Sequence, residues 1–196
     1  MAGFYAVYHG KEGLLAIANK INSLASSLRK NLDKLGFESI NDHFFDTLVI
    51  KTKGKTESIH KRALDNQINL RRIDSESVGL SLDETSSFDD LNTLLEIFAG
   101  SEVNAEISES TAIPDALIRK SSFLDHAIFN QFHTETELLR YIRKLSDKDI
   151  ALDRAMIPLG SCTMKLNATS EMVPVSWPEF SNIHPFAPRD QLAGYE

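Results

Sequence analysis

Residues 12–35 constrain the fold of this chain more than any other segment. Apolar residues recur there every three or four positions, the spacing of one face of an α-helix. They are Leu14, Ile17, Ile21, Leu24, Leu28, Leu32 and Leu35. Gly36 follows directly, and glycine is the residue that most often ends a helix. The sequence therefore predicts one long amphipathic helix that ends at Gly36.

Short strands and two further helices are predicted next. Residues 45–52 form an apolar, β-branched run typical of a buried strand. Residues 68–74 and 78–83 alternate between apolar and polar positions, and the short link between them favours a hairpin. Residues 57–66 have helical character. Another helix is expected from Ser87, where Asp90 completes a capping box, to Gly100. This order predicts an α+β sandwich, in which helices cover one face of a small antiparallel or mixed sheet.

The pattern changes after residue 100. Residues 101–122 are polar, weakly periodic and interrupted by Pro114, so we interpret them as a boundary. Thr134 and Glu137 form a second capping box at the start of a further helix. The apolar stripe of that helix consists of Leu138, Leu139, Ile142 and Leu145.

Proline dominates the last forty residues. Five of the six prolines lie there, namely Pro158, Pro174, Pro178, Pro185 and Pro188. Each restricts its own backbone and that of the residue before it, so this segment is predicted to be an irregular arm of ordered loop and short turns. A long loop in a compact protein is usually functional or lies against a partner surface.

Charge and composition argue against several classes of protein. The net charge of −7 does not suit a nucleic-acid-binding protein, which needs a basic face. No stretch approaches the ~20 apolar residues of a transmembrane helix, and the first ten residues do not resemble a signal peptide. A single cysteine, Cys162, cannot form an internal disulfide, which favours a reducing compartment. We interpret both ends of the sequence as cuts through a longer chain.

Residues 157–167, IPLGSCTMKLN, gather the residue types of an active site. Their spacing matches neither a phosphate-binding P-loop nor the Ser-x-x-Lys of penicillin-binding enzymes. Two interpretations stay open: a loop with a chemical role, or a turn in which Ser161 and Thr163 satisfy local backbone groups. Cys162 is likewise either a nucleophile or a small buried hydrophobic residue.

The positions of the histidines do not indicate a metal-binding or catalytic site. The six of them show no metal-ligand spacing, so no metal site is expected. His184, which precedes Pro185, either faces a pocket or is a structural histidine with satisfied hydrogen bonds. Turn and capping residues follow the third predicted strand, and they are Asp83, Glu84 and Thr85.

Seven segments together resemble the glycine cleavage system P-protein family. They are YHGKEGL, INLR, VGLSLDET, FHTETELLRYIRKL, MIPLGSCTMKLN, WPEF and HPF. They follow the family's order and cover essentially the whole chain. One departure is Lys11, where the family pattern has proline, and both residues suit a helix start.

This resemblance implies an α/β, fold-type I enzyme that uses pyridoxal phosphate (PLP) and consists of two related halves. Residues 1–118 then correspond to the small C-terminal α+β domain of the first half. Residues 119–196 correspond to the linker helix and proline-rich N-terminal arm of the second half, without the large PLP-binding domain. The Schiff-base lysine is expected downstream, since the only His-Lys pair here, His60-Lys61, lies in a surface-type helix.

The resemblance also implies an activity. Such an enzyme decarboxylates glycine and transfers the aminomethyl group to the lipoyl arm of the H-protein. Its partners would be the H-protein, other components of the system and further copies of itself. It would work in the cytoplasm of a bacterium or in the mitochondrion of a eukaryote.

The resemblance implies that the arm lines part of the cofactor or substrate site. The residues concerned are Ser161, Thr163, Lys165, Asn167 and His184. Lys165 is expected to act as a point charge toward an anion and not as the Schiff-base lysine. The chain alone is expected to be inactive. The alternative is a non-catalytic interaction or regulatory module derived from this family.

Overall fold

The computed structural model describes residues 1–108, 112–150 and 168–195. By its internal contacts the chain divides into two compact units, Met1–Leu138 and Leu139–Glu196. The boundary predicted at residue 118 refers to the domains of the larger enzyme and stays a prediction. No helix among the described residues is both long enough and apolar enough to cross a membrane.

The long first helix, α1 (Ala2–Lys34), covers the predicted segment up to Lys34 and begins earlier; Leu35 is its C-cap residue. Gly10 interrupts it with φ 61° and ψ −171°, so that Lys11 starts a new helical run. The helix ends as predicted, because Gly36 adopts φ 82°. The Phe37 N–H then donates to the Leu32 carbonyl at 2.9 Å, which satisfies a group at the helix end.

Three antiparallel strands form one sheet in the order β1-β3-β2. They are β1 (Thr47–Lys51), β2 (Arg71–Arg72) and β3 (Ser77–Ser81). The predicted hairpin of β2 and β3 is confirmed, with Arg72 opposite Val78. However, β2 is much shorter than residues 68–74, because Ile68 and Leu70 pack against the core outside the strand.

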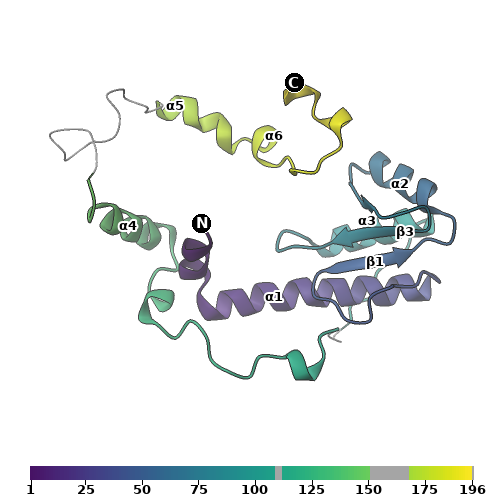
Figure 1. Cartoon of the computed structure of the whole chain (residues 1–196), viewed down its shortest axis with the longest axis horizontal. Helices are drawn as coiled ribbons and strands as arrows, with labels where there is room; N and C mark the ends of the chain where they lie inside the picture. Colours follow the sequence, from purple (N-terminus) through teal and green to yellow (C-terminus); the bar gives the residue numbers. More distant parts are fainter. Residues whose placement is uncertain (109–111, 151–167, 196) are drawn as a thin grey trace. The chain divides into compact units, whose positions relative to one another are not determined.

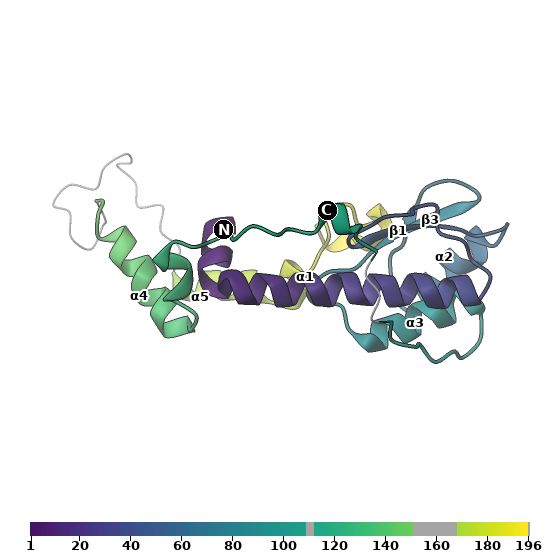
Figure 2. The same ribbon diagram turned by 90° about the horizontal axis from the view of Figure 1, so that it is seen from below.

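The sheet has one apolar face. Leu48 lies opposite Leu80, and Ile50 lies opposite Val78, so these four buried side chains share a face. They belong to a core that also contains residues of α1, α2 (Thr56–Asp65) and α3 (Phe88–Ala99). The predicted α+β unit is therefore present, and Figures 1 and 2 show the sheet, α2 and α3 gathered beside the C-terminal part of α1.

The ends of α3 follow the predicted signals. The Ser87 N–H donates to the Asp90 carboxylate at 2.7 Å, and the Asp90 N–H donates to the Ser87 hydroxyl at 3.3 Å. Gly100 closes the helix with φ 80°. Arg62 of α2 adds two bonds, from Nε to the Ile97 carbonyl at 2.5 Å and from Nη2 to the Phe98 carbonyl at 3.3 Å. These caps join α2 to the C-terminal end of α3.

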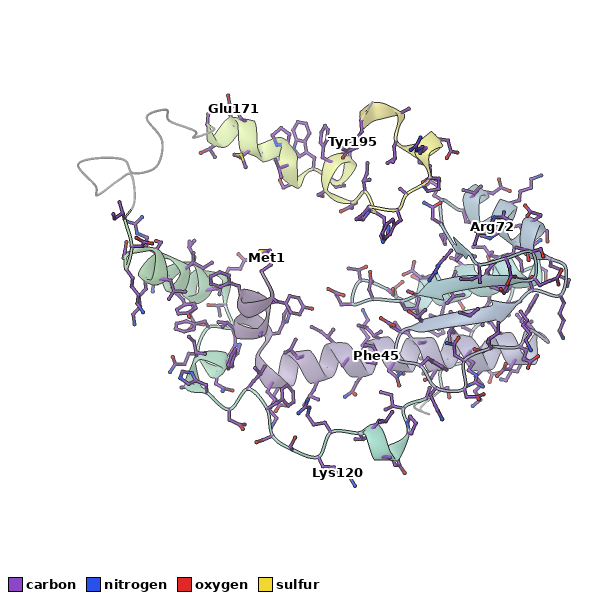
Figure 3. All side chains as sticks on the ribbon, viewed as in Figure 1. Met1, Phe45, Arg72, Lys120, Glu171 and Tyr195 are labelled. Atoms are coloured by element: carbon purple, nitrogen blue, oxygen red, sulfur yellow. The ribbon has the colours of Figure 1, made fainter. Side chains whose placement is uncertain are left out.

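The chain after α3 returns along α1 toward its N-terminal end (Figures 1 and 2). This segment contains the short helices η1 (Asp115–Leu117) and η2 (Ala127–Asn130). Figure 3 shows Lys120 on it, directed away from α1. His133 then contacts the break in α1, with 2.7 Å between its Nδ1 and the Tyr8 carbonyl oxygen.

The helix predicted after Thr134 is α4 (Glu135–Ser146). Its capping box is confirmed: the Glu137 N–H donates to the Thr134 hydroxyl, and the Thr134 N–H donates to the Glu137 carboxylate, both at 3.3 Å. The predicted apolar stripe is partly open to solvent: Leu139 is 68% and Ile142 38% exposed, whereas Leu138 and Leu145 are half-buried.

The described end of the second unit consists of single helical turns. They are α5 (Thr169–Met172), η3 (Val173–Ser176), α6 (Pro178–Ser181), η4 (Arg189–Gln191) and η5 (Ala193–Tyr195). Pro178 occupies the first position of α6, where its missing N–H breaks no helical bond. For these residues the prediction of short turns is confirmed.

Candidate functional site

Most of the predicted site residues fall outside the described part of the chain. These are Ser161, Thr163, Lys165 and Asn167, together with Cys162. Of the five residues predicted to line a cofactor or substrate site, only His184 can be placed. It lies in the second unit, between α6 and η4.

The His184 imidazole is exposed and held by its own loop. Its Nδ1 accepts a hydrogen bond of 3.0 Å from the Phe186 N–H, and the two rings lie 5.8 Å apart. A nitrogen that accepts must be unprotonated, so the neutral ring carries its proton on Nε2. His184 can therefore present a donor, but one exposed imidazole does not enclose a cofactor.

An aromatic cluster lies beside this loop in the chain. The ring centroids of Trp177 and Phe180 are 6.3 Å apart, and those of Phe180 and Tyr195 are 6.5 Å apart. The Tyr195 hydroxyl donates to the Phe180 carbonyl at 3.0 Å, which fixes the ring (Figure 3 labels Tyr195). All three side chains are at least half exposed. This cluster is therefore an exposed apolar surface.

Glu171 defines the start of the described arm (Figure 3). Its carboxylate accepts a hydrogen bond of 2.9 Å from the Ala168 N–H. Carboxylates are favoured in the first turn of a helix, where backbone N–H groups lack partners. A local cap therefore fixes the start of α5.

Asp83 has the turn role that the sequence predicts. Its carboxylate accepts from the Thr85 N–H at 2.9 Å, the Thr85 hydroxyl at 2.7 Å and the Ser86 N–H at 3.1 Å. The Thr85 hydroxyl is the largest cause that lowers the pKa of Asp83. These bonds shape the loop before α3.

His60 differs from the surface position that its sequence context predicts. Lys61 is exposed, but the His60 ring is half-buried and its Nε2 has no hydrogen-bond partner within the described chain. Burial is the largest cause that lowers the pKa of His60, and the Arg72 guanidinium lowers it further, while Glu57 acts in the opposite direction. We therefore interpret the half-buried His60 ring as a packing residue of α2.

Three polar residues of the first unit were missed by sequence analysis. Ser27 and Asn31 of α1 are buried, and Asn92 of α3 is half-buried. All three bond to the backbone of residues 105–108. From the apolar stripe of a helix, such polar positions are expected to face solvent. Only the folded structure shows that these three bind the backbone of another segment. The described residues hold no group of three histidine, cysteine, aspartate or glutamate side chains placed for a metal ion.

The class of protein follows from comparison with known sequences. The profile of the glycine cleavage system P-protein matches residues 1–98, which is half of the chain, so the chain belongs to this family. Over its full length it is 52% identical to a protein of Paraburkholderia xenovorans (strain LB400) named glycine dehydrogenase (decarboxylating). The alignment covers 207 residues, and the chain spans 21% of the length of that relative.

Proposed function

We propose that this chain is part of a PLP-dependent glycine decarboxylase that passes the aminomethyl group of glycine to the lipoyl arm of the H-protein. The observation that carries the proposal is the 52% identity, which extends through both units of the chain. The chain spans 21% of that relative, so the activity belongs to a longer protein and the chain alone is inactive.

PLP supplies the electron sink for the carboxylate that leaves glycine. The larger protein would hold it in a fold-type I domain, with the Schiff-base lysine outside this chain. Within the chain, Ser161 and Thr163 are the proposed hydrogen-bond donors to an anionic group of substrate or cofactor. Lys165 is the proposed point charge toward the same group, and Asn167 contributes an amide beside it.

His184 is the one proposed site residue whose geometry is known. Its Nδ1 is occupied by the Phe186 N–H, so Nε2 would present the proton toward a ligand. The proposed role is orientation of the ligand by one hydrogen bond. His184 needs walls from the rest of the protein to act in this way, because its ring is exposed.

The aromatic cluster supports an arm that packs against other parts of the larger protein. Trp177, Phe180 and Tyr195 expose 50%, 53% and 56% of their surface, and burial of aromatic rings is strongly favourable. A covered arm would also keep water from the reacting carboxylate. The partners proposed for the larger protein are the H-protein, other components of the glycine cleavage system and further copies of itself. The proposed location is a bacterial cytoplasm or a mitochondrion.

Release of CO₂ from carboxyl-labelled glycine tests this function. The full-length protein is expected to release CO₂ when PLP and lipoylated H-protein are present, and the 196-residue chain is not. A full-length protein that binds PLP without decarboxylating glycine would overturn the proposal.

The exposed aromatic cluster also favours a second function, a non-catalytic interaction or regulatory module. The two proposals differ in what the isolated chain does when it is added to the full-length enzyme. A part of the catalytic protein leaves the rate of CO₂ release unchanged, whereas a regulatory module changes it in proportion to its concentration.

A further inference from the structure

The segment that leaves α3 is held by side chains and not by a neighbouring strand. In this strap, residues 103–108, three successive anchors are backbone N–H groups. The Ala105 N–H donates to Asn92 Oδ1 at 2.9 Å, the Glu106 N–H to Asn31 Oδ1 at 3.1 Å, and the Ser108 N–H to Ser27 Oγ at 2.9 Å. The strap therefore ties α1 to α3.

Asn31 uses its whole amide for this purpose. Its Nδ2 donates to the Glu106 carbonyl at 2.8 Å and to the Ser27 carbonyl at 2.7 Å, while its Oδ1 accepts from the Glu106 N–H. One side chain thus pairs with both backbone groups of Glu106, as an adjacent β-strand would. The side chain is only 4% exposed, and an amide so deeply buried is costly unless its hydrogen bonds are made.

Packing adds to these bonds. Val103 and Ala105 contact the core, and Ser108 is 2% exposed. Lys34 also forms an ion pair with Glu106, but both side chains are largely exposed, and exposed ion pairs contribute little. The buried backbone bonds therefore decide the path of the strap.

We propose that Ser27, Asn31 and Asn92 form a clamp that sets the direction in which the chain leaves α3. The clamp recognises backbone, so it fixes the path of the strap without specifying its side chains. Asn31 is the central positioning residue, because it pairs with both backbone groups of Glu106, whereas Asn92 and Ser27 each accept from one N–H on either side of it, those of Ala105 and Ser108. This inference concerns the first unit and is independent of the proposed function.

Hydrogen exchange on the 196-residue chain tests the clamp. Asn31→Ala is expected to raise amide exchange at Glu106 roughly 5- to 150-fold, the factor for the loss of two hydrogen bonds. The exchange rates of the amides that are hydrogen-bonded between β1 and β3 should change much less. Asn22→Ala is the matched control: Asn22 is also a buried asparagine of α1, 5% exposed, but it donates to the carbonyls of Phe44 and Phe45.

Three results would overturn the proposal. One is unchanged exchange at Glu106 and Ser108 in folded Asn31→Ala. Another is an equal rise throughout the first unit, which would show a general loss of stability. A third is release of the strap by Asn22→Ala. If Asn31→Ala does not fold, Asn92→Ala provides the test. The clamp predicts faster amide exchange at Ala105 in this variant and unchanged amide exchange in β1 and β3.

Discussion

At the residue scale, Arg62 joins two helices through main-chain carbonyls. Its guanidinium bonds to Ile97 and Phe98 at the C-terminal end of α3, where positive charge is favoured. We expect Arg62→Met to lower the free energy of unfolding by about 1.5 to 3 kcal/mol, the range for hydrogen bonds to charged groups. Urea unfolding of the 196-residue chain measures this. Lys61→Met, at the exposed neighbouring position, should leave stability almost unchanged, and equal losses in both variants would refute the role of Arg62.

His60 makes stability depend on pH. Burial lowers the pKa of His60 in the fold below the ordinary value of 6.5, and the Arg72 guanidinium lowers it further against the opposing effect of Glu57. His60 therefore binds a proton more readily in the unfolded chain than in the folded chain. Above pH 6.5 the neutral His60 therefore adds to the free energy of unfolding. This contribution is lost as the pH falls through the lowered pKa of His60 in the fold.

The expected result is a urea midpoint that falls with acidification below about pH 6.5, with a smaller slope in His60→Gln. His43→Gln is the control, because His43 is exposed. Identical slopes in the wild-type chain and His60→Gln would contradict this prediction.

At the element scale, the break in α1 depends on Gly10. Its φ of 61° and ψ of −171° lie in a region that only glycine adopts readily. A Cβ there would also lie 2.7 Å from both His133 Cε1 and the Phe129 carbonyl oxygen. We expect Gly10→Ala to cost about 1 to 3 kcal/mol of folding stability and to separate His133 from Tyr8.

Chemical denaturation and the NMR signals of His133 measure these two effects. Gly3→Ala is the matched control within the same helix, because a Cβ at Gly3 would meet no atom within 4 Å and the φ of Gly3 is ordinary. A Gly10→Ala chain as stable as Gly3→Ala would show that the break is not required.

Elements set by local signals were predictable, and elements set by tertiary contacts were not. The capping boxes at Ser87 and Thr134 depend on residues three positions apart, so sequence alone located both helix starts. The break at Gly10 depends on a close contact with η2, far along the chain. The amide pairing of Asn31 with Glu106 likewise joins residues that no local pattern connects.

At the scale of the whole molecule, the candidate site came from resemblance more than from local pattern. The spacing of Ser161, Thr163 and Lys165 matches no general catalytic motif, and only the match along the chain indicated a role. A site assembled from several parts of a long protein leaves no complete motif in any one of them. The exposed ring of His184, held only by its own loop, is consistent with this proposal.

Lys165→Ala in the full-length protein tests the proposed role of that side chain. We expect PLP to remain bound with its visible absorbance, because the Schiff base is proposed to form on a lysine outside this chain. Glycine decarboxylation should fall by one to three decades, or about 1.4 to 4 kcal/mol, through loss of a charge that faces an anion. Lys148→Ala, at an exposed position in the turn after α4, is the control and should retain full activity. Unchanged decarboxylation in Lys165→Ala would contradict the assignment.

We propose that this chain supplies a scaffold and a wall of the active site, while the reactive lysine lies elsewhere in the larger protein. Borohydride reduction of the full-length protein with bound PLP, followed by peptide mapping, tests it most directly. We expect the reduced pyridoxyl group on a lysine outside these 196 residues. A pyridoxyl group on Lys165, or on any other lysine of this chain, would contradict it.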